Sequence, residues 1–545
     1  MKIQFLGAAK MVTGSNYLIT TENEKFIIDC GLFQGGSEEE NLNKEPFKFE
    51  PSEIDFAILT HAHIDHSGRI PLLVKEGFTS SIYATKPTVD LCNIMLLDSA
   101  KIQESDTQWE NKKRMRAGKP LIEPLYTSKD AISSLNNLKP CYYDELVVIN
   151  ENITVRFSDA GHILGSAIVE IWIKEKNKTT KIVFSGDLGM PNKPIINNPS
   201  YIEEADYVIV ESTYGNTIHE NLETNVLDLI KIINDTSMKG GTVIIPSFAV
   251  GRTQELIYEL NNYYENNEEI AYHQRIPIYI DSPMAVKATE AFMENTYFFN
   301  KETKDRILSG DSVFEFENLK YVSSTEESMA LNKVRFPRVI ISSSGMATAG
   351  RVRHHLKHNL WDENSAVVFV GYQANGTLGR LLLDGKKEIK LLGEEIAVKA
   401  SIHSLKGFSG HADEPMLLDW LSRFKEKPKM VFVVHGENDE QVQFCSTVKN
   451  NLGFNCIIPN LFDEFDIDYS GKTEYKELGK ESMEENLIVE FQSLVDTIKG
   501  IQNRNLSIKF KDIDSKKYFD IKRNLNEIKD NMMDLSRYLD NEKKS

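Results

Sequence analysis

Short apolar runs separated by turns fill the first 70 residues and predict β-strands. They lie at residues 3–6, 16–20, 25–29 and 55–60, and the last leads directly into His61. The segment that follows, HSGRIPLLVKEG, has a helical pattern. Residues 89–118 predict a longer polar helix, and this helix ends in a basic cluster, Lys112, Lys113, Arg114 and Arg116, which we interpret as a solvated helix face or a substrate rim.

From about residue 213 to 395 the pattern changes to strand-like runs that alternate with helical segments. The strand-like runs are TVIIPSF, PIYIDS, RVIISSS and AVVFVGY, and TQELIYELNNYYENN is one of the helical segments. Such alternation is typical of βαβ units on a parallel sheet. Residues 396–460 return to short strands, among them 430–434. The pattern therefore predicts an α/β protein with a parallel-sheet region at about 213–395.

Residues 461–545 differ from the rest, because apolar positions recur there at alternating spacings of four and three. One series covers residues 487–501 and the other covers 521–539. The spacing predicts two amphipathic helices with narrow apolar seams. Each is only about two to three heptads long, which is short for an independent coiled coil. The two helices could therefore form a hairpin packed on the rest of the chain or an arm that forms a homodimer, and both interpretations stay open.

The composition indicates a globular protein of more than one domain, without a membrane span. The chain of 545 residues is too long for one hydrophobic core, and 41% hydrophobic and 26% charged residues are typical of a globular protein. It has no run of about 18 apolar residues and no signal-peptide pattern at its start, so we expect no membrane span. Five scattered cysteines without CxxC spacing predict reduced thiols and a cytoplasmic location.

The net charge of −18 argues against a uniformly basic nucleic-acid surface, because phosphate contacts come from Lys and Arg. A local basic channel over a metal site stays compatible with that charge. Two bound divalent ions would themselves be the largest positive charge in their neighbourhood.

Four metal-binding side chains lie close together at the end of the apolar strand 55–60: His61, His63, Asp65 and His66. Neutral imidazole and carboxylate are the ligands that borderline divalent metals prefer. Histidines two residues apart on an extended chain can converge on one ion, and the following Asp-His pair can reach a second. A lone histidine is more often structural, but four such groups at one strand end predict a metal site.

Three more candidate ligands follow strand ends later in the chain. They are His162 in SDAGHILGS, Asp187 in FSGDLG and His435 in VVHGEND, each next to a glycine that lets the backbone approach a site closely. Each alone would be read as a turn residue or a cap. Together with the first cluster they complete a seven-ligand set, for which we expect two divalent ions, zinc or, as the alternative, manganese.

The order HxHxDH, followed by a distant His, Asp and His, resembles the metallo-β-lactamase superfamily. The resemblance implies an αββα sandwich in which His61, His63 and His162 hold one metal, Asp65, His66 and His435 hold the other, and Asp187 bridges them. Asp29 in FIIDCG matches the superfamily's first motif and is expected to support the ligands from behind. Redox di-iron relatives carry Glu at the position of His63, so the hydrolytic branch is favoured.

Further motifs make the chain similar to the β-CASP subgroup of RNA- and DNA-processing nucleases, which includes the cleavage-and-polyadenylation endonuclease. Glu211 in VESTYG matches motif A, His411 in FSGHADE matches motif B, and His435 matches motif C. The segments PSFAVGRTQE, SSSGMATAGR and GYQANGTLGR also resemble the subgroup. The resemblance covers about residues 1–460. A histidine at motif C is typical of the members that act on RNA, so single-stranded RNA is the expected substrate.

This resemblance implies a domain order. A metallo-β-lactamase domain in two parts, 1–212 and 396–460, would enclose a β-CASP domain at 213–395. A helical C-terminal extension at 461–545 would follow, and the resemblance does not cover it.

The implied chemistry is hydrolysis of a phosphodiester bond. Two metals about 3.5–4 Å apart can clamp the attacking and leaving oxygens and lower the pKa of a bound water to about 7. The two-metal-activated hydroxide would lie beside Asp187. His411 would protonate the leaving 3′ oxygen as general acid, and Glu211 would orient it. Endonuclease and 5′-exonuclease action both stay open.

Four arginines are candidates for binding the phosphates of the substrate, and three other functions remain as alternatives. Arg252, Arg351, Arg353 and Arg380 are candidate phosphate partners, and Arg351 lies at a predicted helix start that could bind an anion. A DNA nuclease of the same fold, a small-molecule hydrolase and a non-catalytic RNA-processing scaffold are the alternatives. The complete ligand set counts against the scaffold. The large insert would enclose the metals in a deep groove suited to a nucleic-acid strand, which counts against a small-molecule substrate.

Overall fold

The computed structural model describes residues 1–476 apart from 177, 268–275, 335, 375 and 468–472. The chain divides into two compact units, residues 1–479 and 480–545, and all the described residues belong to the first. The two helices predicted at 487–501 and 521–539 lie outside the described residues.

Within the described residues, the first sheet has eight strands in the order β23-β22-β1-β2-β3-β4-β5-β6. The strands are β1 (Lys2–Phe5), β2 (Tyr17–Thr20), β3 (Lys25–Ile28), β4 (Phe56–Ile58), β5 (Ser81–Thr85), β6 (Leu138–Cys141), β22 (Glu464–Ile467) and β23 (Thr473–Lys476). Pairing is antiparallel from β23 to β3 and parallel from β3 to β6. The strands predicted in the first 60 residues are confirmed.

A second sheet of seven described strands has the order β21-β20-β11-β10-β9-β8-β7. The strands are β7 (Leu146–Val148), β8 (Ile153–Asp159), β9 (Ala167–Glu175), β10 (Lys178–Phe184), β11 (Tyr207–Val210), β20 (Met430–Val433) and β21 (Cys456–Ile457). Because β9 is antiparallel to both neighbours and β10, β11 and β20 are parallel, the strands β8, β10, β11 and β20 all point the same way. Their carboxyl ends therefore share one edge of the sheet.

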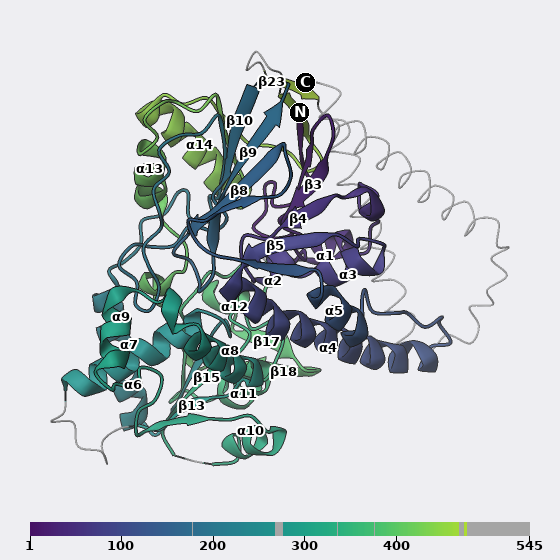
Figure 1. The fold of residues 1–545 in the computed structure, drawn as a ribbon. Coiled ribbons are helices and arrows are strands. Elements are labelled where there is room, and N and C mark those ends of the chain that lie inside the picture. Colours follow the sequence, from purple (N-terminus) through teal and green to yellow (C-terminus); the bar gives the residue numbers. More distant parts are fainter. Residues whose placement is uncertain (177, 268–275, 335, 375, 468–472, 477–545) are drawn as a thin grey trace, which may run out of the picture. The chain divides into compact units, whose positions relative to one another are not determined.

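The two sheets pack face to face with helices outside (Figure 1). Their inner faces share one apolar cluster that includes Phe5 and Phe26 from the first sheet and Val155, Phe184 and Phe432 from the second. The helices of this part are α1 (Ser37–Leu42), α2 (Ile64–Ser67), α3 (Ile70–Lys75), α4 (Lys86–Arg116), α5 (Ser128–Leu135), α13 (Glu414–Ser422) and α14 (Asn438–Leu452), with 3₁₀ turns η1 (Pro51–Glu53) and η4 (Lys406–Phe408). Helices α3–α5 contribute to the apolar cluster outside the first sheet, and α13 and α14 to that outside the second. This is the expected αββα sandwich.

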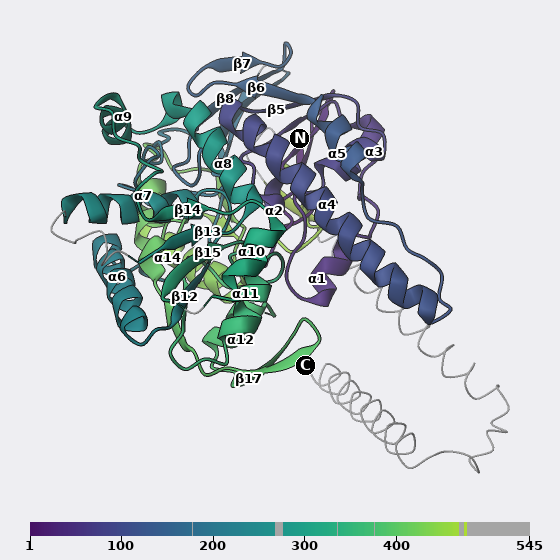
Figure 2. The ribbon, with the colours of Figure 1, turned by 90° about the horizontal axis from the view of Figure 1, so that it is seen from below.

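Strands between residues 242 and 404 form a third sheet, whose described members have the order β14-β13-β15-β12-β16-β19 and are parallel throughout. Figure 2 labels β14, β13, β15 and β12 of this sheet. The strands are β12 (Thr242–Pro246), β13 (Ile278–Ile280), β14 (Leu319–Tyr321), β15 (Arg338–Ser342), β16 (Ala366–Phe369) and β19 (Ser401–Ser404), with a separate hairpin of β17 (Glu388–Leu391) and β18 (Glu394–Ala397). The helices are α6 (Leu222–Met238), α7 (Arg252–Asn266), α8 (Pro283–Glu294), α9 (Lys301–Leu308), α10 (Thr325–Leu331), α11 (Val352–Asn359) and α12 (Leu378–Leu383), with a 3₁₀ turn η3 (Thr296–Phe298). The predicted parallel sheet is confirmed.

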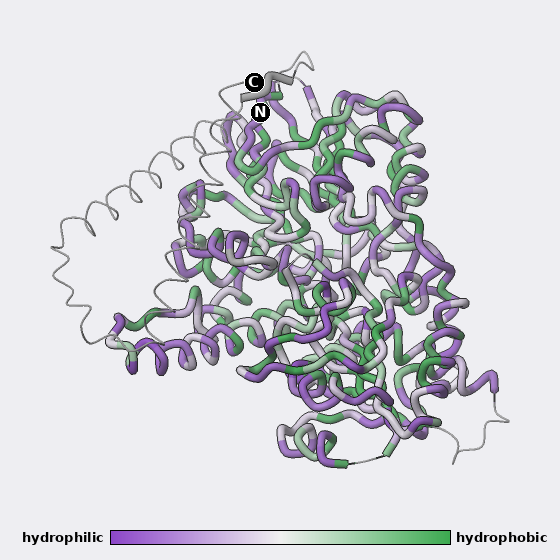
Figure 3. The backbone as a smooth tube through the Cα atoms, turned by 180° about the vertical axis from the view of Figure 1, so that it is seen from behind, coloured by the Kyte–Doolittle hydropathy of each residue, from purple (hydrophilic) through white to green (hydrophobic). Residues whose placement is uncertain are grey.

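The central strands of the third sheet are apolar at nearly every position because helices cover both faces. Strands β12, β15 and β16 are buried along their whole lengths. Val243 and Ile245 pack in a cluster with α6 and α7, whereas Ile244 between them packs with α11 and α12. Continuous Val/Ile runs are typical of such doubly covered parallel strands. Figure 3 shows the same contrast, with apolar stretches inside and hydrophilic stretches on the outer segments.

The part of the predicted helical extension that the structure describes is not helical. Strands β22 and β23 lie at 464–467 and 473–476, and β22 pairs with β1 at the edge of the first sheet. The reason is a period-two pattern, in which buried Phe465 and Ile467 flank exposed Asp466. Among the described helices, none has the length and apolar character needed to cross a membrane.

Candidate metal centre and active site

The predicted ligands lie at strand ends that face each other across the sandwich. His61 follows β4 of the first sheet, and His162, Asp187 and His435 follow β8, β10 and β20 of the second. Since those three strands point the same way, their loops meet at one edge. All seven predicted ligands come together there in two donor groups, and Asp187 belongs to the first group and also lies next to the second.

The first donor group contains His61, His63, His162 and Asp187. His63 Nδ1 lies 3.2 Å from His61 Nε2 and 3.1 Å from His162 Nε2. Asp187 Oδ2 lies 3.4 Å from His61 Nε2 and 3.6 Å from His162 Nε2. Four potential ligand atoms thus surround one point.

The second donor group contains Asp65, His66 and His435. His66 Nε2 lies 3.2 Å from His435 Nε2, which is 3.5 Å from Asp65 Oδ2. The other oxygen of Asp187, Oδ1, lies 3.3 Å from His66 Nε2 and 3.7 Å from His435 Nε2. Asp187 therefore turns one carboxylate oxygen toward each group.

These distances fit a metal ion at each group. A tetrahedral site with bonds of about 2.1 Å has ligand atoms about 3.4 Å apart, close to the spacings within both groups. In addition, Asp187 Oδ1 is buried and has no hydrogen-bond partner among the described residues. A buried carboxylate oxygen without a donor needs a cation to satisfy it.

Burial keeps the histidines of the first group in the form that binds metals. Desolvation lowers the pKa of His63 to about 4 and holds the pKa of His61 and that of His162 well below the ordinary value. Burial alone would raise the pKa of Asp187, but His435, His66 and His61 hold it well below its usual range. The group therefore offers neutral imidazoles and an ionised carboxylate.

Hydrogen bonds behind the ligands fix three of the imidazole rings. His66 Nδ1 donates to Asp29 Oδ2 at 2.7 Å, and Asp29 is held in turn by the backbone N–H and hydroxyl of Thr60 at 2.8 and 2.9 Å. His162 Nδ1 donates to the carbonyl of Gly410 at 3.0 Å, and the Thr213 hydroxyl lies 3.0 Å from His435 Nδ1. Such contacts direct the opposite ring nitrogen toward the metal. Asp29 has the supporting place that the sequence predicted.

Glu211 and His411 form a pair beside the donor groups. His411 Nδ1 lies 3.0 and 3.1 Å from the two oxygens of Glu211 and 3.9 Å from Asp187 Oδ2. Glu211 is buried and also accepts hydrogen bonds from the backbone N–H groups of Leu188, at 2.6 Å, and Thr213, at 3.2 Å. The carboxylate is thus fixed, and it occupies Nδ1 of His411 so that Nε2 stays available.

The four candidate phosphate partners differ in what already holds them. Arg351 donates to buried Asp281 at 2.7 Å, which ties it into the core of the insert. Arg380 is exposed and pairs with Asp384 at 3.0 Å, and Arg353 is half-buried on α11. Arg252 is buried at the start of α7 and pairs with Glu255. Arg252 Nη2 lies 3.1 Å from the point where a Cβ on Gly410 would stand, and His162 borders the same point.

A cavity of about 230 Å³ adjoins the His411 loop, and both domains line it. Tyr214 and Ser409 lie in the loops after β11 and η4, and Tyr372 and Arg380 lie in the insert. The Tyr214 ring lies 6.2 Å from the ring of His411 and 5.7 Å from that of Tyr372. The cavity thus offers aromatic faces and a cation next to the candidate acid.

Sequence reasoning missed residues whose role depends on position alone. Thr60 and Thr213 support ligands, and Phe248 of the insert places its ring 6.3 Å from that of His63. Thr213 stands two residues after Glu211, so closeness to motif A was a usable signal. Nothing in the pattern around Phe248 indicates a contact with a residue so distant in the chain.

Buried imidazole and carboxylate donors at the strand ends of an αββα sandwich, with a carboxylate–imidazole pair beside them, define a metal-dependent hydrolase of the metallo-β-lactamase fold. Sequence models of three families match: the metallo-beta-lactamase superfamily at residues 10–128, the Beta-Casp domain at 253–382, and the Zn-dependent metallo-hydrolase RNA specificity domain at 395–459.

Curated relatives agree with these matches. The chain is 38% identical over 440 residues to Ribonuclease TTHA0252 of Thermus thermophilus, an alignment that covers 81% of this chain and 94% of that protein. It is 32% identical over 476 residues to Transcription termination factor FttA of Methanocaldococcus jannaschii, with 85% and 71% covered. The FttA of Methanosarcina mazei is 32% identical over 469 residues, with 83% and 69% covered. The chain therefore belongs to the β-CASP family of the metallo-β-lactamase superfamily.

Proposed function

We propose that this protein is a ribonuclease that hydrolyses phosphodiester bonds of single-stranded RNA with two divalent ions, zinc in the first place, and His411 as general acid. The seven metal ligands would be His61, His63, Asp65, His66, His162, Asp187 and His435. The observation that carries the proposal is the contact of Glu211, His411 and Asp187, which joins an acid–base pair to both donor groups.

The site's own residues have distinct tasks in this mechanism. When bound, two divalent ions would neutralise phosphate charge and lower the pKa of an attacking water. Asp187, which turns one oxygen to each donor group, would orient that water through a hydrogen bond. His411 would then donate the proton on Nε2 to the leaving 3′ oxygen, while Glu211 accepts the hydrogen bond from Nδ1 and keeps the ring in place.

Electrostatics favour His411 as the acid. Burial alone lowers its pKa, but the Glu211 carboxylate and, more weakly, Asp187 and Asp65 outweigh burial and raise it to about 9. The ring therefore carries its proton at neutral pH, as a general acid must. The neutral histidines of the first donor group, with lowered pKa values, are suited to the opposite task of binding metal.

Three observations support single-stranded RNA as the substrate. The match to an RNA specificity domain, residues 395–459, contains both His411 and His435. One relative is called a ribonuclease and covers most of the chain. The cavity beside His411, with Tyr214, Tyr372 and Arg380, offers the stacking and cationic contacts that single strands use.

The experiment is cleavage of end-labelled single-stranded RNA by the metal-loaded protein, with product lengths and end groups analysed. We expect products with 3′-hydroxyl and 5′-phosphate ends, and their lengths distinguish internal cleavage from 5′-exonuclease action. His411→Ala should lower kcat by about 10²–10⁴-fold at unchanged metal content. His403→Ala, a histidine on β19 that bonds Ser401, is the matched control. Undiminished cleavage by the His411 variant would remove the general-acid role.

Two alternatives make different predictions. A DNA nuclease of this fold would cleave a matched DNA oligonucleotide at least as fast as the RNA. A non-catalytic scaffold would bind RNA without cutting it and would contain near-zero metal after purification. The complete donor set counts against the scaffold.

The cellular location and the oligomeric state belong to the same proposal. All five cysteines are free and buried, which supports a reducing compartment and hence the cytoplasm. A homodimer through residues 480–545 stays a prediction. Light scattering of the full chain and of a deletion of 480–545 would test it, and an unchanged mass would argue against a dimer arm.

A further inference from the structure

We propose that Arg252 is the phosphate-binding residue that the inserted domain contributes to the active site. Its guanidinium would contact a non-bridging oxygen of the phosphodiester beside the first donor group. This inference rests on the proposed function, because it concerns the same site. It singles out one of the four arginines that the sequence left as equal candidates.

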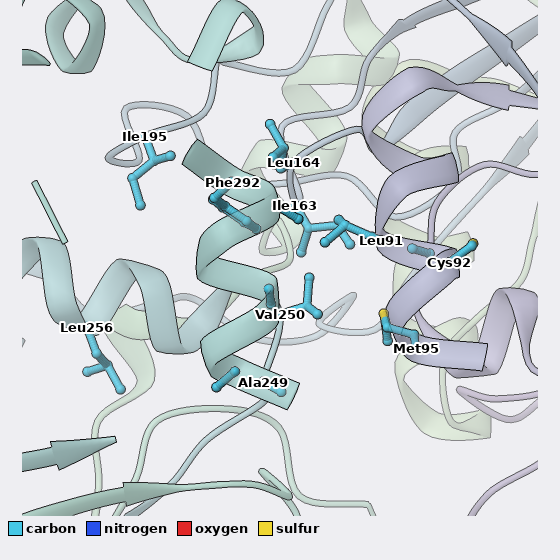
Figure 4. Close-up of a cluster of buried hydrophobic side chains, with 14 of the residues drawn as sticks. Leu91, Cys92, Met95, Ile163, Leu164, Ile195, Ala249, Val250, Leu256 and Phe292 are labelled. Atoms are coloured by element: carbon cyan, nitrogen blue, oxygen red, sulfur yellow. The ribbon is translucent and has the colours of Figure 1, made fainter. Parts of the chain in front are cut away.

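The start of α7 is pressed against the loop that carries His162. Gly251, at φ +82°, precedes Arg252, and a Cβ on Gly251 would lie 2.7 Å from Ile163 Cγ2. Val250 and Ile163 belong to one buried apolar cluster with Leu91 of α4, and Figure 4 shows the three grouped together. This apolar contact fixes the position of Arg252 relative to the donor groups.

The guanidinium faces His162 and the His411 loop. Arg252 Nη2 and His162 Cε1 each lie 3.1 Å from the point where a Cβ on Gly410 would stand. Gly410 accepts the hydrogen bond of His162 Nδ1 and directly precedes His411. Arg252 therefore borders the same small space as a candidate metal ligand and the candidate acid.

The charges around Arg252 leave an excess of positive charge. Arg252 and Lys193 both pair with Glu255, and all three side chains are buried. Burial and then the neighbouring Glu255 raise the pKa of Glu259 to about 7, so Glu259 is only partly ionised near neutral pH. Burial lowers the pKa of Lys193 to about 8, so at neutral pH Lys193 is still mostly charged, and it shares little more than one carboxylate with Arg252. Such an arrangement is costly unless an anion binds there.

A purely structural role would explain the contact of only one of the two terminal nitrogens of Arg252. Nη1 pairs with Glu255 on its own helix, and that contact anchors the side chain. Nη2 lies on the opposite branch of the fork, against Gly410. Guanidinium is suited to phosphate because its planar fork presents several N–H donors at once. Phe248, four residues earlier, covers His63 from the same loop and would limit water there.

The first test measures binding of inorganic phosphate to the metal-loaded protein by calorimetry. Arg252→Gln should weaken phosphate binding by roughly ten- to a hundredfold, the usual effect of losing a hydrogen bond between charged groups. Arg252→Lys should recover part of the affinity. Arg306→Gln is the matched control, because Arg306 pairs with Glu265 and Asp311 within the insert. Unchanged phosphate affinity in Arg252→Gln would overturn the proposal.

The second test measures RNA cleavage together with melting temperature and metal content. Arg252→Gln should lower kcat by about 10²–10³-fold with the metal content and melting temperature of the wild type. Added guanidinium chloride at millimolar concentration should restore part of the activity of Arg252→Ala but not alter that of Arg306→Ala. Loss of metal or of folding in both Arg252 variants, without rescue, would assign the residue a structural role and overturn the proposal.

The two tests separate this inference from the proposed function. If the wild type fails to cleave RNA while phosphate binding still depends on Arg252, the phosphate site stands and the ribonuclease proposal falls. If cleavage requires His411 but neither phosphate binding nor kcat changes in Arg252→Gln, the ribonuclease stands and the phosphate site falls.

Discussion

The sandwich and the inserted domain meet at the donor groups, but they contribute different kinds of contact. Among the described residues, all seven candidate ligands belong to the sandwich, and hydrogen bonds to Asp29, Gly410 and Thr213 hold three of them. The insert instead brings an aromatic ring, Phe248, and a buried cation, Arg252, against the first group. This division implies that metal binding and substrate binding can be changed separately.

The largest loss of metal and of activity is expected on removing the Asp187 carboxylate, which lies between the two donor groups. Asp187→Ala removes an oxygen from each group, so metal content should fall and RNA cleavage should drop to background. Elemental analysis of the purified protein, paired with the cleavage assay, checks this. Asp419→Ala, an exposed carboxylate on α13, serves as control. Full metal content in the Asp187 variant would break the assignment of the bridging ligand.

A smaller loss of metal affinity is expected on changing Asp29, which supports a histidine of the second donor group. Asp29 holds Nδ1 of His66 at 2.7 Å, so Asp29→Asn weakens the support while leaving every ligand in place. Loss of such a supporting carboxylate typically costs about 10–100-fold in metal affinity. Competition with a chelator measures that loss. An affinity equal to that of the wild type would mean that Asp29 supports the fold and not the metal.

The pH profile should depend on the carboxylate beside the acid. A general acid is active while protonated, so activity is full below the pKa of His411 and is lost as the pH rises through it. Burial lowers that pKa, and Glu211 is the first of the groups that raise it to about 9. Glu211→Gln should therefore move the alkaline limb of kcat to lower pH, by roughly 1–3 units. A limb that stays in place would exclude this pairing in catalysis.

The sequence could predict that the seven candidate ligands come together, because they lie in loops and a short helix that follow apolar strands, and strand ends are visible in the pattern of residues. The same pattern could not predict that Gly410 would receive His162 Nδ1, a contact across 248 residues. It also could not rank Arg252 above Arg351, because a buried partner, here Asp281 for Arg351, becomes known only when the insert is folded. Residues 464–467 show the opposite error: a short period-two strand was absorbed into a predicted helical tail.

The smallest expected effect tests the apolar contact that positions Arg252. Gly251 has φ +82° and ψ −69°, a sparsely populated backbone conformation that costs a residue with a side chain about 1–3 kcal/mol, and an added Cβ would lie 2.7 Å from Ile163. Gly251→Ala should therefore lower the melting temperature slightly and reduce kcat. Metal content is measured alongside, because Ile163 adjoins the candidate ligand His162. Gly240→Ala, at φ +77° with no atom within 4 Å of the added carbon, also places a side chain at a positive φ but adds no contact. If both variants lose stability but only Gly251→Ala has a lower kcat, the contact with Ile163 positions Arg252. If the two variants have the same kcat, the packing of α7 against the His162 loop does not affect the reaction.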